Sequence, residues 1–228
     1  MYQTKSAILA CFLIVFSFSA PAFATNTASE YRQLALLYAL LYRQQGRHLE
    51  SIAAMQKSVE LEPENITGKI NLGWTLHLSG QEQQAAKYLW QAIYQHPFQY
   101  SAYNALGIVY LVDGNLPTAV VIHTWAVILK PKNEIAFYNL SLALHRLKIF
   151  NIAIATANYA ASLEPNNPHP LVASAIAYWD SGEQNLAKNT YQKAIYLDNR
   201  YKHSSFLINL KQAAFTQGQI NTAKILAK

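Results

Sequence analysis

Apolar residues recur along most of this chain at spacings of three and four, the separations that place side chains on one face of an α-helix. Tyr103, Leu106 and Tyr110 form one such series, and after a glycine a second series includes Ala119 and Ala126. Two helices that each bury one face against the other account for the two series. The pattern therefore predicts pairs of packed helices.

The two-helix pattern returns every 34 residues, which is a period typical of helical repeat proteins. The period is marked by Pro63, Pro97, Pro131 and Pro165, by Gly46, Gly80, Gly114 and Gly182, by Ala85, Ala119, Ala153 and Ala187, and by Ser58, Ala92, Ala126, Ala160 and Ala194. Small residues let the paired helices approach closely, glycine allows the positive φ of the turn between them, and proline ends the second helix. Lys148 replaces the turn glycine of one unit, which predicts a different, looser turn there.

These columns resemble the tetratricopeptide repeat. In one unit the resemblance is carried by Tyr103, Leu106, Gly107, Tyr110, Gly114, Ala119, Ala126 and Pro131. The resemblance implies an all-α fold, a right-handed α-solenoid of antiparallel helix pairs, with five full repeats and a partial C-terminal one. The repeats are expected at residues 32–65, 66–99, 100–133, 134–167 and 168–201, with the partial repeat at 204–228.

The partial repeat departs from the register of the others. Leu207, Leu210, Gly218 and Ala223 fit the repeat only if two residues are inserted near Tyr201. The segment is therefore expected to form a terminal cap or a truncated repeat.

The N-terminus has a different composition. Lys5 precedes an apolar run at residues 7–18, and Ala22, Phe23 and Ala24 form a small-x-small sequence. This order predicts a signal peptide at residues 1–24, cleaved after Ala24, a short linker at 25–31 and export to a periplasm or comparable lumen. An uncleaved anchor is the alternative, although crossing a bilayer takes about 20 apolar residues.

The charge and the cysteine content of the chain argue against several classes of function. The net charge is +6, one unit lower once Lys5 is removed, and no block of like charges appears. Nucleic-acid binding is therefore not expected, whereas the charge allows weak association with an anionic membrane surface or an acidic partner. Cys11 is the only cysteine, so the mature chain is expected to form no disulfide and no thiolate metal site.

The family resemblance also implies a binding groove, because positions 2, 5, 9, 12 and 13 of each first helix line the concave wall of such solenoids. Carried onto this chain, the predicted groove consists of Ile70, Trp74, His77, Asn104, Ile108, Leu111, Tyr138, Leu142, His145, Arg146, Val172, Ile176 and Trp179. The same positions also hold Leu78, Val112 and Ile135.

Position 9 is apolar in four consecutive units, at Trp74, Ile108, Leu142 and Ile176. An exposed apolar stripe usually marks a binding surface. It predicts a groove for an apolar or amphipathic segment. The alternative is that these residues touch neighbouring repeats in a tightly wound superhelix.

No arrangement of residues predicts catalysis, a metal site or a cofactor. His77 and His145 are two repeats apart, and His123 stands where a large packing residue is usual, which suggests a core histidine with a hydrogen-bond partner. Motifs for a zinc protease, a serine hydrolase or a phosphate loop are missing from the sequence. We therefore expect no enzyme, but an exported adaptor for a protein or peptide that supports an envelope or secretion complex, acting as a monomer or a complex subunit. The alternative is a permanent structural or regulatory subunit that engages its partner through the ends of the solenoid.

Overall fold

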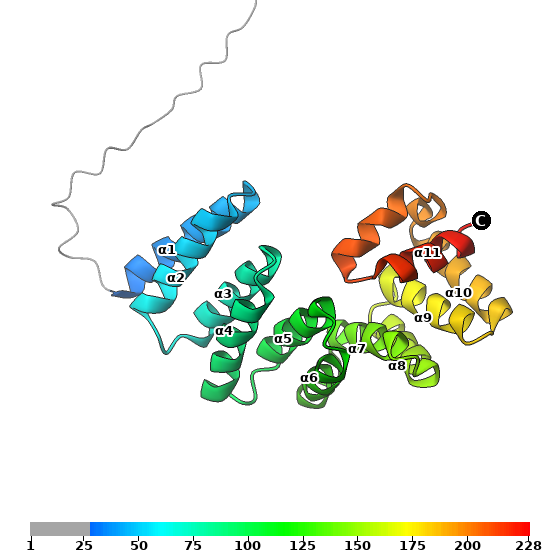
Figure 1. The fold of residues 1–228 in the computed structure, drawn as a ribbon, viewed down its shortest axis with the longest axis horizontal. Helices are drawn as coiled ribbons and strands as arrows, with labels where there is room; N and C mark the ends of the chain where they lie inside the picture. Colours follow the sequence, from blue (N-terminus) through cyan, green and yellow to red (C-terminus); the bar gives the residue numbers. More distant parts are fainter. Residues whose placement is uncertain (1–27) are drawn as a thin grey trace, which may run out of the picture.

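The computed structural model describes residues 28–228, so the predicted signal peptide and residues 25–27 of the predicted linker lie outside the described residues, whereas residues 28–31 of the linker are the start of a helix. Within residues 28–228, ten α-helices follow one another as five antiparallel pairs, and two short 3-10 helices and a final α-helix follow them (Figure 1). The elements are α1 (Ala28–Gln44), α2 (His48–Leu61), α3 (Ile66–Leu78), α4 (Glu82–Gln95), α5 (Tyr100–Asp113), α6 (Leu116–Leu129), α7 (Glu134–Arg146), α8 (Phe150–Leu163), α9 (Pro168–Asp180), α10 (Gln184–Leu197), η1 (Asn199–Lys202), η2 (Phe206–Ala213) and α11 (Gln217–Leu226). The predicted all-α solenoid of helix pairs is confirmed.

The pairs follow a curved path, and the odd-numbered helices form its inner row (Figure 1). Helix α3 contacts α5, α5 contacts α7, and α7 contacts α9, in addition to the contacts inside each pair. The even-numbered helices α4 to α10 form the outer, convex row. None of the helices within residues 28–228 combines the length and the apolar character needed to cross a membrane.

Small residues hold the two helices of a pair together, as the sequence predicts. A methyl group added to Gly73 would come within 2.6 Å of Leu89, and one added to Gly107 within 2.5 Å of the His123 ring. The repeated alanines at 85, 119, 153 and 187 are fully buried. A larger side chain at these positions would push the paired helices apart.

Lys148 does not loosen its turn. It takes a φ of 62°, close to the 71–94° of the four turn glycines. Its amide donates to the carbonyl of His145 at 2.8 Å, as the amide of Gly80 donates to His77 at 2.9 Å. The expectation of a different turn is therefore wrong, because the packed helices on either side impose the left-handed conformation on a lysine.

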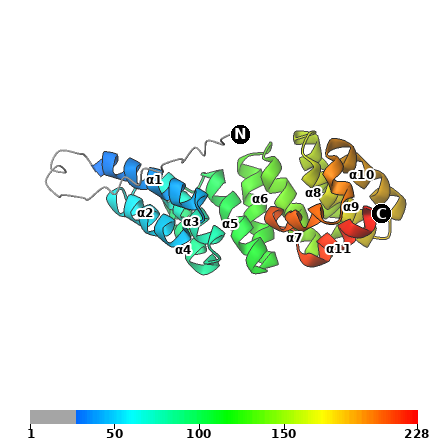
Figure 2. The same ribbon diagram turned by 90° about the horizontal axis from the view of Figure 1, so that it is seen from above.

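The C-terminal segment, residues 206–228, does not continue the two-helix pattern. Its first part is the 3-10 helix η2, and α11 contacts η2 and the inner helix α9 more extensively than the outer helix α10. Seen from above, η2 and α11 lie across α7 and α9 on the inner side of the solenoid (Figure 2). The segment thus fills part of the concave surface.

Candidate protein-binding groove

The concave wall is divided into a covered half and an open half. Six of the thirteen predicted groove residues are buried, namely Leu111, Tyr138, Leu142, His145, Val172 and Ile176. The other seven are partly exposed, namely Ile70, Trp74, His77, Asn104, Ile108, Arg146 and Trp179. The wall is accessible mainly along α3 and α5.

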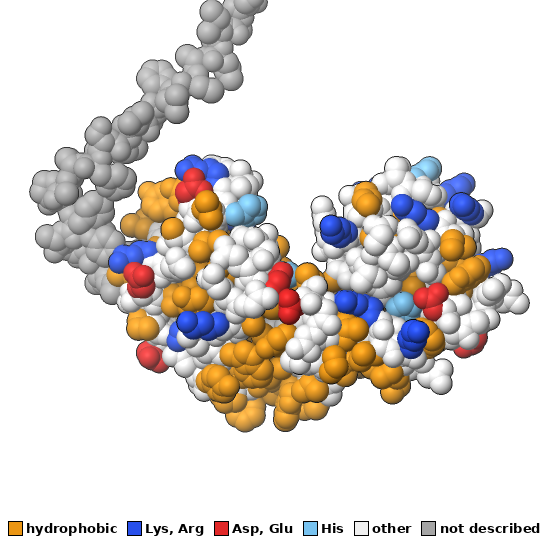
Figure 3. All heavy atoms as spheres, viewed as in Figure 1, with side chains coloured by type: hydrophobic (Ala, Val, Ile, Leu, Met, Phe, Trp, Pro, Cys, Tyr) orange, Lys and Arg blue, Asp and Glu red, His pale blue; other side chains and the backbone are white. Residues whose placement is uncertain are grey.

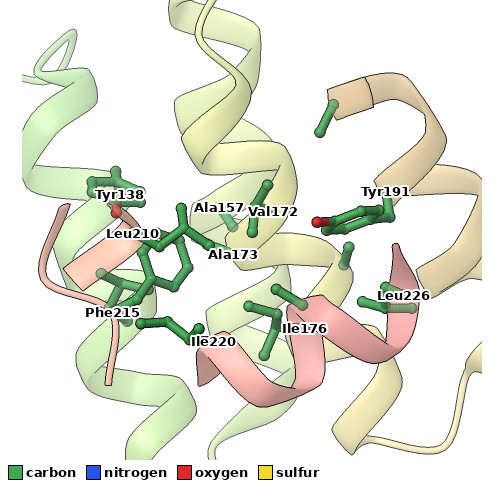
Figure 4. Packing of buried hydrophobic residues seen from close by; sticks show 14 of the residues in the cluster. Tyr138, Ala157, Val172, Ala173, Ile176, Tyr191, Leu210, Phe215, Ile220 and Leu226 are labelled. Atoms are coloured by element: carbon green, nitrogen blue, oxygen red, sulfur yellow. The ribbon is translucent and has the colours of Figure 1, made fainter. Parts of the chain in front are cut away.

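Apolar side chains of the C-terminal segment cover the wall along α7 and α9. Figure 4 shows Leu210, Phe215 and Ile220 facing Tyr138 and Ile176. All three are at most 3% exposed, and Ile176 is 1% exposed. The segment therefore occupies the place where the sequence predicted an open stripe.

Polar contacts fix the same segment. The Tyr138 hydroxyl donates to the carbonyl of Ala213, and burial raises the pKa of Tyr138 well above its usual value, which keeps the hydroxyl a donor. The Gln219 amide donates to Nδ1 of His145 at 3.0 Å, and Nε2 of His145 lies 2.8 Å from a carboxylate oxygen of Asp180. Because Gln219 also forms a capping box with Thr216, the start of α11 is tied to both α7 and α9.

The expectation of an exposed stripe is consequently wrong for Leu142 and Ile176. Both belong to one buried cluster that contains residues of the neighbouring inner helices and of the C-terminal segment, and Figure 4 shows Ile220 of that segment beside Ile176. Only Trp74 and Ile108 of the stripe lie in the open half.

The open half forms a hollow of about 780 Å³ between α3, α5, α7 and the end of η2. In the space-filling view the molecule is hollowed between its two arms (Figure 3). Leu78, Val112 and Ile135 border the hollow with 45–50% of their surface exposed, and Trp74 and Ile108 line it as well. An apolar concave surface of this size suits part of a peptide or helix.

Three of the most exposed apolar residues around the hollow are therefore absent from the predicted groove set. Leu78, Val112 and Ile135 occupy positions that the family resemblance places on the concave wall. Position 9 is apolar in four successive units, whereas positions 2 and 13 are each apolar in only some of them. The repeat pattern therefore predicts binding residues at position 9, although the fold leaves residues at positions 2 and 13 more exposed.

The polar residues predicted in the groove already have partners within the chain. Nδ1 of His77 lies 2.7 Å from a carboxylate oxygen of Glu82. Asn104 exchanges hydrogen bonds with Asn133, and Arg146 donates to the backbone carbonyl of Leu111. These side chains connect neighbouring helices, so the hollow offers mainly apolar contacts.

Charged groups stand at the edge of the hollow. Glu134 accepts a hydrogen bond of 2.9 Å from Asn167, and burial raises the pKa of its carboxyl, with a smaller contribution from Glu164. Lys211, in the last turn of η2, also lines the hollow. Within residues 28–228 no three metal-binding side chains lie close enough together to hold an ion.

Comparisons with known proteins agree with this fold. Two segments match the family model described as tetratricopeptide repeat, residues 33–65 and 170–201, which correspond to the first and fifth helix pairs. No curated protein is significantly similar to the chain in sequence.

Several solved structures of MamA are similar in architecture. MamA from Desulfovibrio magneticus, from its residue 41 onward, matches with a TM-score of 0.68 at 17% identity over 76% of this chain and 98% of that one. Another crystal structure of MamA matches with 0.64 at 20% identity, over 75% and 93% of the two chains. At these identities the similarity establishes the fold alone. The chain is therefore similar to MamA in its solenoid architecture and to tetratricopeptide repeats in two of its helix pairs.

Proposed function

We propose that the hollow between α3, α5 and α7 binds an apolar or amphipathic segment of a partner protein, and that the protein is a non-enzymatic adaptor. Solenoids of this kind are protein-interaction scaffolds, which agrees with such a role. The observation that carries the proposal is the group of half-exposed apolar side chains, Leu78, Val112 and Ile135, around one concave hollow. Monomeric proteins rarely leave such a group exposed without a binding role.

The covered half of the wall indicates which kind of ligand the open half would bind. There, the same inner row holds α11, a ten-residue amphipathic helix whose Ile220 and Ala223 are buried while Asn221 and Ile225 face outward. A helix of similar character from another protein would find comparable chemistry in the open half.

The proposed setting is extracytoplasmic. The apolar run at residues 7–18 and the small-x-small sequence ending at Ala24 support export, and lie outside the described residues. An adaptor in a periplasm would serve the assembly of an envelope or secretion complex.

The groove can be tested at Val112. A photo-crosslinking amino acid at this position, in cells expressing the full chain, should capture a partner whose crosslinked segment can be identified and synthesised as a peptide. Val112→Glu should weaken peptide binding at least tenfold, because the bound peptide would bury an unpaired carboxylate. Leu186→Glu, at a similarly exposed site on α10, is the matched control. Equal affinities of the two variants would refute the groove.

A second candidate function is supported by α1. Leu34, Leu37, Tyr38 and Leu41 follow helical spacing and are 39–52% exposed at the N-terminal end of the described solenoid. Terminal repeats usually present a polar outer face. A permanent partner bound at this end would be released by Leu37→Glu and retained by Val112→Glu, and the reverse result would favour the adaptor.

A further inference from the structure

Helix α6 has no charged residue on any of its faces. Its inward residues Ile122 and Ala126 are buried, but its outward residues Val121, Trp125 and Ile128 are apolar too. A helix that is apolar all round is normally buried on all sides. In this solenoid, α6 belongs to the outer row and its outward face is exposed.

The neighbouring outer helices extend this surface into an outer apolar patch. The patch consists of Tyr94, Phe98, Val121, Trp125, Ile128, Ile152 and Tyr159, each 43–84% exposed. Hydrophobic side chains gather along the lower edge of the molecule, below α4 to α6 (Figure 3). No residue within 28–228 covers them.

The helices of the outer row carry more basic than acidic side chains on their outer faces. Among helices α4, α6, α8 and α10, the basic residues are Lys87, Lys188 and Lys193, all exposed. The one carboxylate in these four helices, that of Glu82, is turned to His77 in the hollow on the other side. The outer faces of these four helices therefore carry only positive charge, whereas exposed carboxylates such as Glu64 and Glu164 stand in the flanking turns.

We propose that the outer apolar patch docks on the surface of a membrane that contains anionic phospholipids. Tryptophan, tyrosine and phenylalanine side chains such as Trp125, Tyr94 and Phe98 are suited to the boundary between headgroups and acyl chains. Lysines beside them complement anionic headgroups. The patch needs only its protruding side chains to enter the lipid.

A second copy of the chain fits the same surface less well. Two convex faces would touch over a limited area, whereas stable interfaces bury about 1,200–2,000 Å² in total. A symmetric contact would also bring the lysines of one copy towards those of the other. A bilayer can adapt to a convex surface and neutralises those lysines.

Membrane docking would also orient the proposed groove. The patch lies mainly on the outer helices α4, α6 and α8, and the hollow is lined by the inner helices α3, α5 and α7. Figure 1 shows these two rows of helices on the outer and inner sides of the curved path. A molecule resting on its convex side would present the hollow to the aqueous phase. The two surfaces can then be inactivated separately.

Vesicle binding of the full chain tests the docking directly. The double variant Trp125→Glu with Ile128→Glu should lower partitioning onto vesicles of phosphatidylcholine and phosphatidylglycerol at least tenfold, and Val112→Glu in the hollow should leave it unchanged. Residues 1–27 are present in every variant, so their contribution is the same throughout. Pure phosphatidylcholine vesicles should bind the unmodified chain severalfold more weakly. Equal binding by both variants, or no preference for anionic vesicles, would overturn the proposal.

A local probe separates docking at the patch from attachment elsewhere. Cys11 is the only cysteine, so Cys11→Ser with Ser162→Cys permits a single environment-sensitive fluorophore one turn from Tyr159. Its emission should shift to the blue on anionic vesicles, and the same label at Val112→Cys should not respond. A response of both labels or of neither would contradict the proposal. A lipid-independent shift that rises with protein concentration, together with a dimer mass in sedimentation, would instead assign the patch to self-association.

Discussion

His123 is a buried polar side chain in the contact between two paired helices. It is fully buried against Gly107, and neither ring nitrogen makes a hydrogen bond to the residues that the structure describes, contrary to the expected partner. Burial lowers its pKa to about 3, against a smaller opposing effect of the Gly107 backbone. The ring is therefore neutral in the folded protein at every pH near neutrality.

His123 predicts an acid-sensitive stability. The unfolded chain binds a proton at this residue below pH about 6.5, whereas the folded chain binds it only near pH 3. Between these values the unfolded state holds more protons, so stability falls with falling pH by about 1.4 kcal/mol per unit from this residue. His123→Leu should remove that part of the slope in urea unfolding from pH 6.5 to 4.

The control is His96→Leu, which removes one histidine from an exposed position. If His123→Leu and the control gave the same dependence on pH, burial of His123 would not be the cause.

Lys148 is a second residue whose type does not suit its place in the structure, because it has the positive φ of a turn glycine. A positive φ costs a residue with a Cβ atom about 1 kcal/mol relative to glycine. Lys148→Gly should therefore stabilise the protein by up to about 1 kcal/mol in chemical denaturation. Gly80→Ala, at φ 74° with no heavy atom within 4 Å of the added methyl group, should destabilise it by a similar amount. Effects of the same sign would show that the turn conformation does not control stability.

At the scale of the elements, the local sequence pattern is sufficient to predict the helix pairs. The spacing of Pro97, Pro131 and Pro165 predicts where second helices end, and each of these prolines lies two residues beyond a helix. The turn glycines and buried alanines were equally predictable, because each acts within one repeat. The family resemblance also placed Trp74 and Ile108 on the concave wall.

The C-terminal segment was not predictable in the same way. The extra residues near Tyr201 shift it out of register with the repeat, so its position depends on contacts with distant parts of the chain. Tyr138 bonds to Ala213, and His145 bonds to Gln219, more than 70 residues away in each case. Periodicity carries no information about such pairs. Of the predicted stripe, Leu142 and Ile176 are therefore buried, and Trp74 and Ile108 are partly exposed.

At the scale of the whole molecule, residues 28–228 carry, besides the exposed face of α1, three apolar surfaces that the helix pairs do not bury among themselves. The C-terminal segment covers one along α7 and α9, the hollow leaves a second open, and the outer apolar patch is the third. Repeat proteins gain stability from neighbouring units and need a cap at each end. The C-terminal segment satisfies that need by folding back onto the inner row instead of extending the solenoid.

Removal of residues 206–228 tests this role of the segment. The deletion would expose Tyr138, Leu142, Val172 and Ile176, so the shortened chain should bind an apolar dye more strongly and unfold at lower denaturant concentration. A synthetic peptide of residues 204–228 should bind the shortened chain and reverse both changes, whereas the same peptide with Ile220→Asp should not. The deletion removes the side of the open hollow formed by residues 211–214 but leaves Leu78, Val112 and Ile135 in place, so ligand binding there should weaken without being lost. A shortened chain with unchanged stability and dye binding would mean that the segment does not stabilise the inner row.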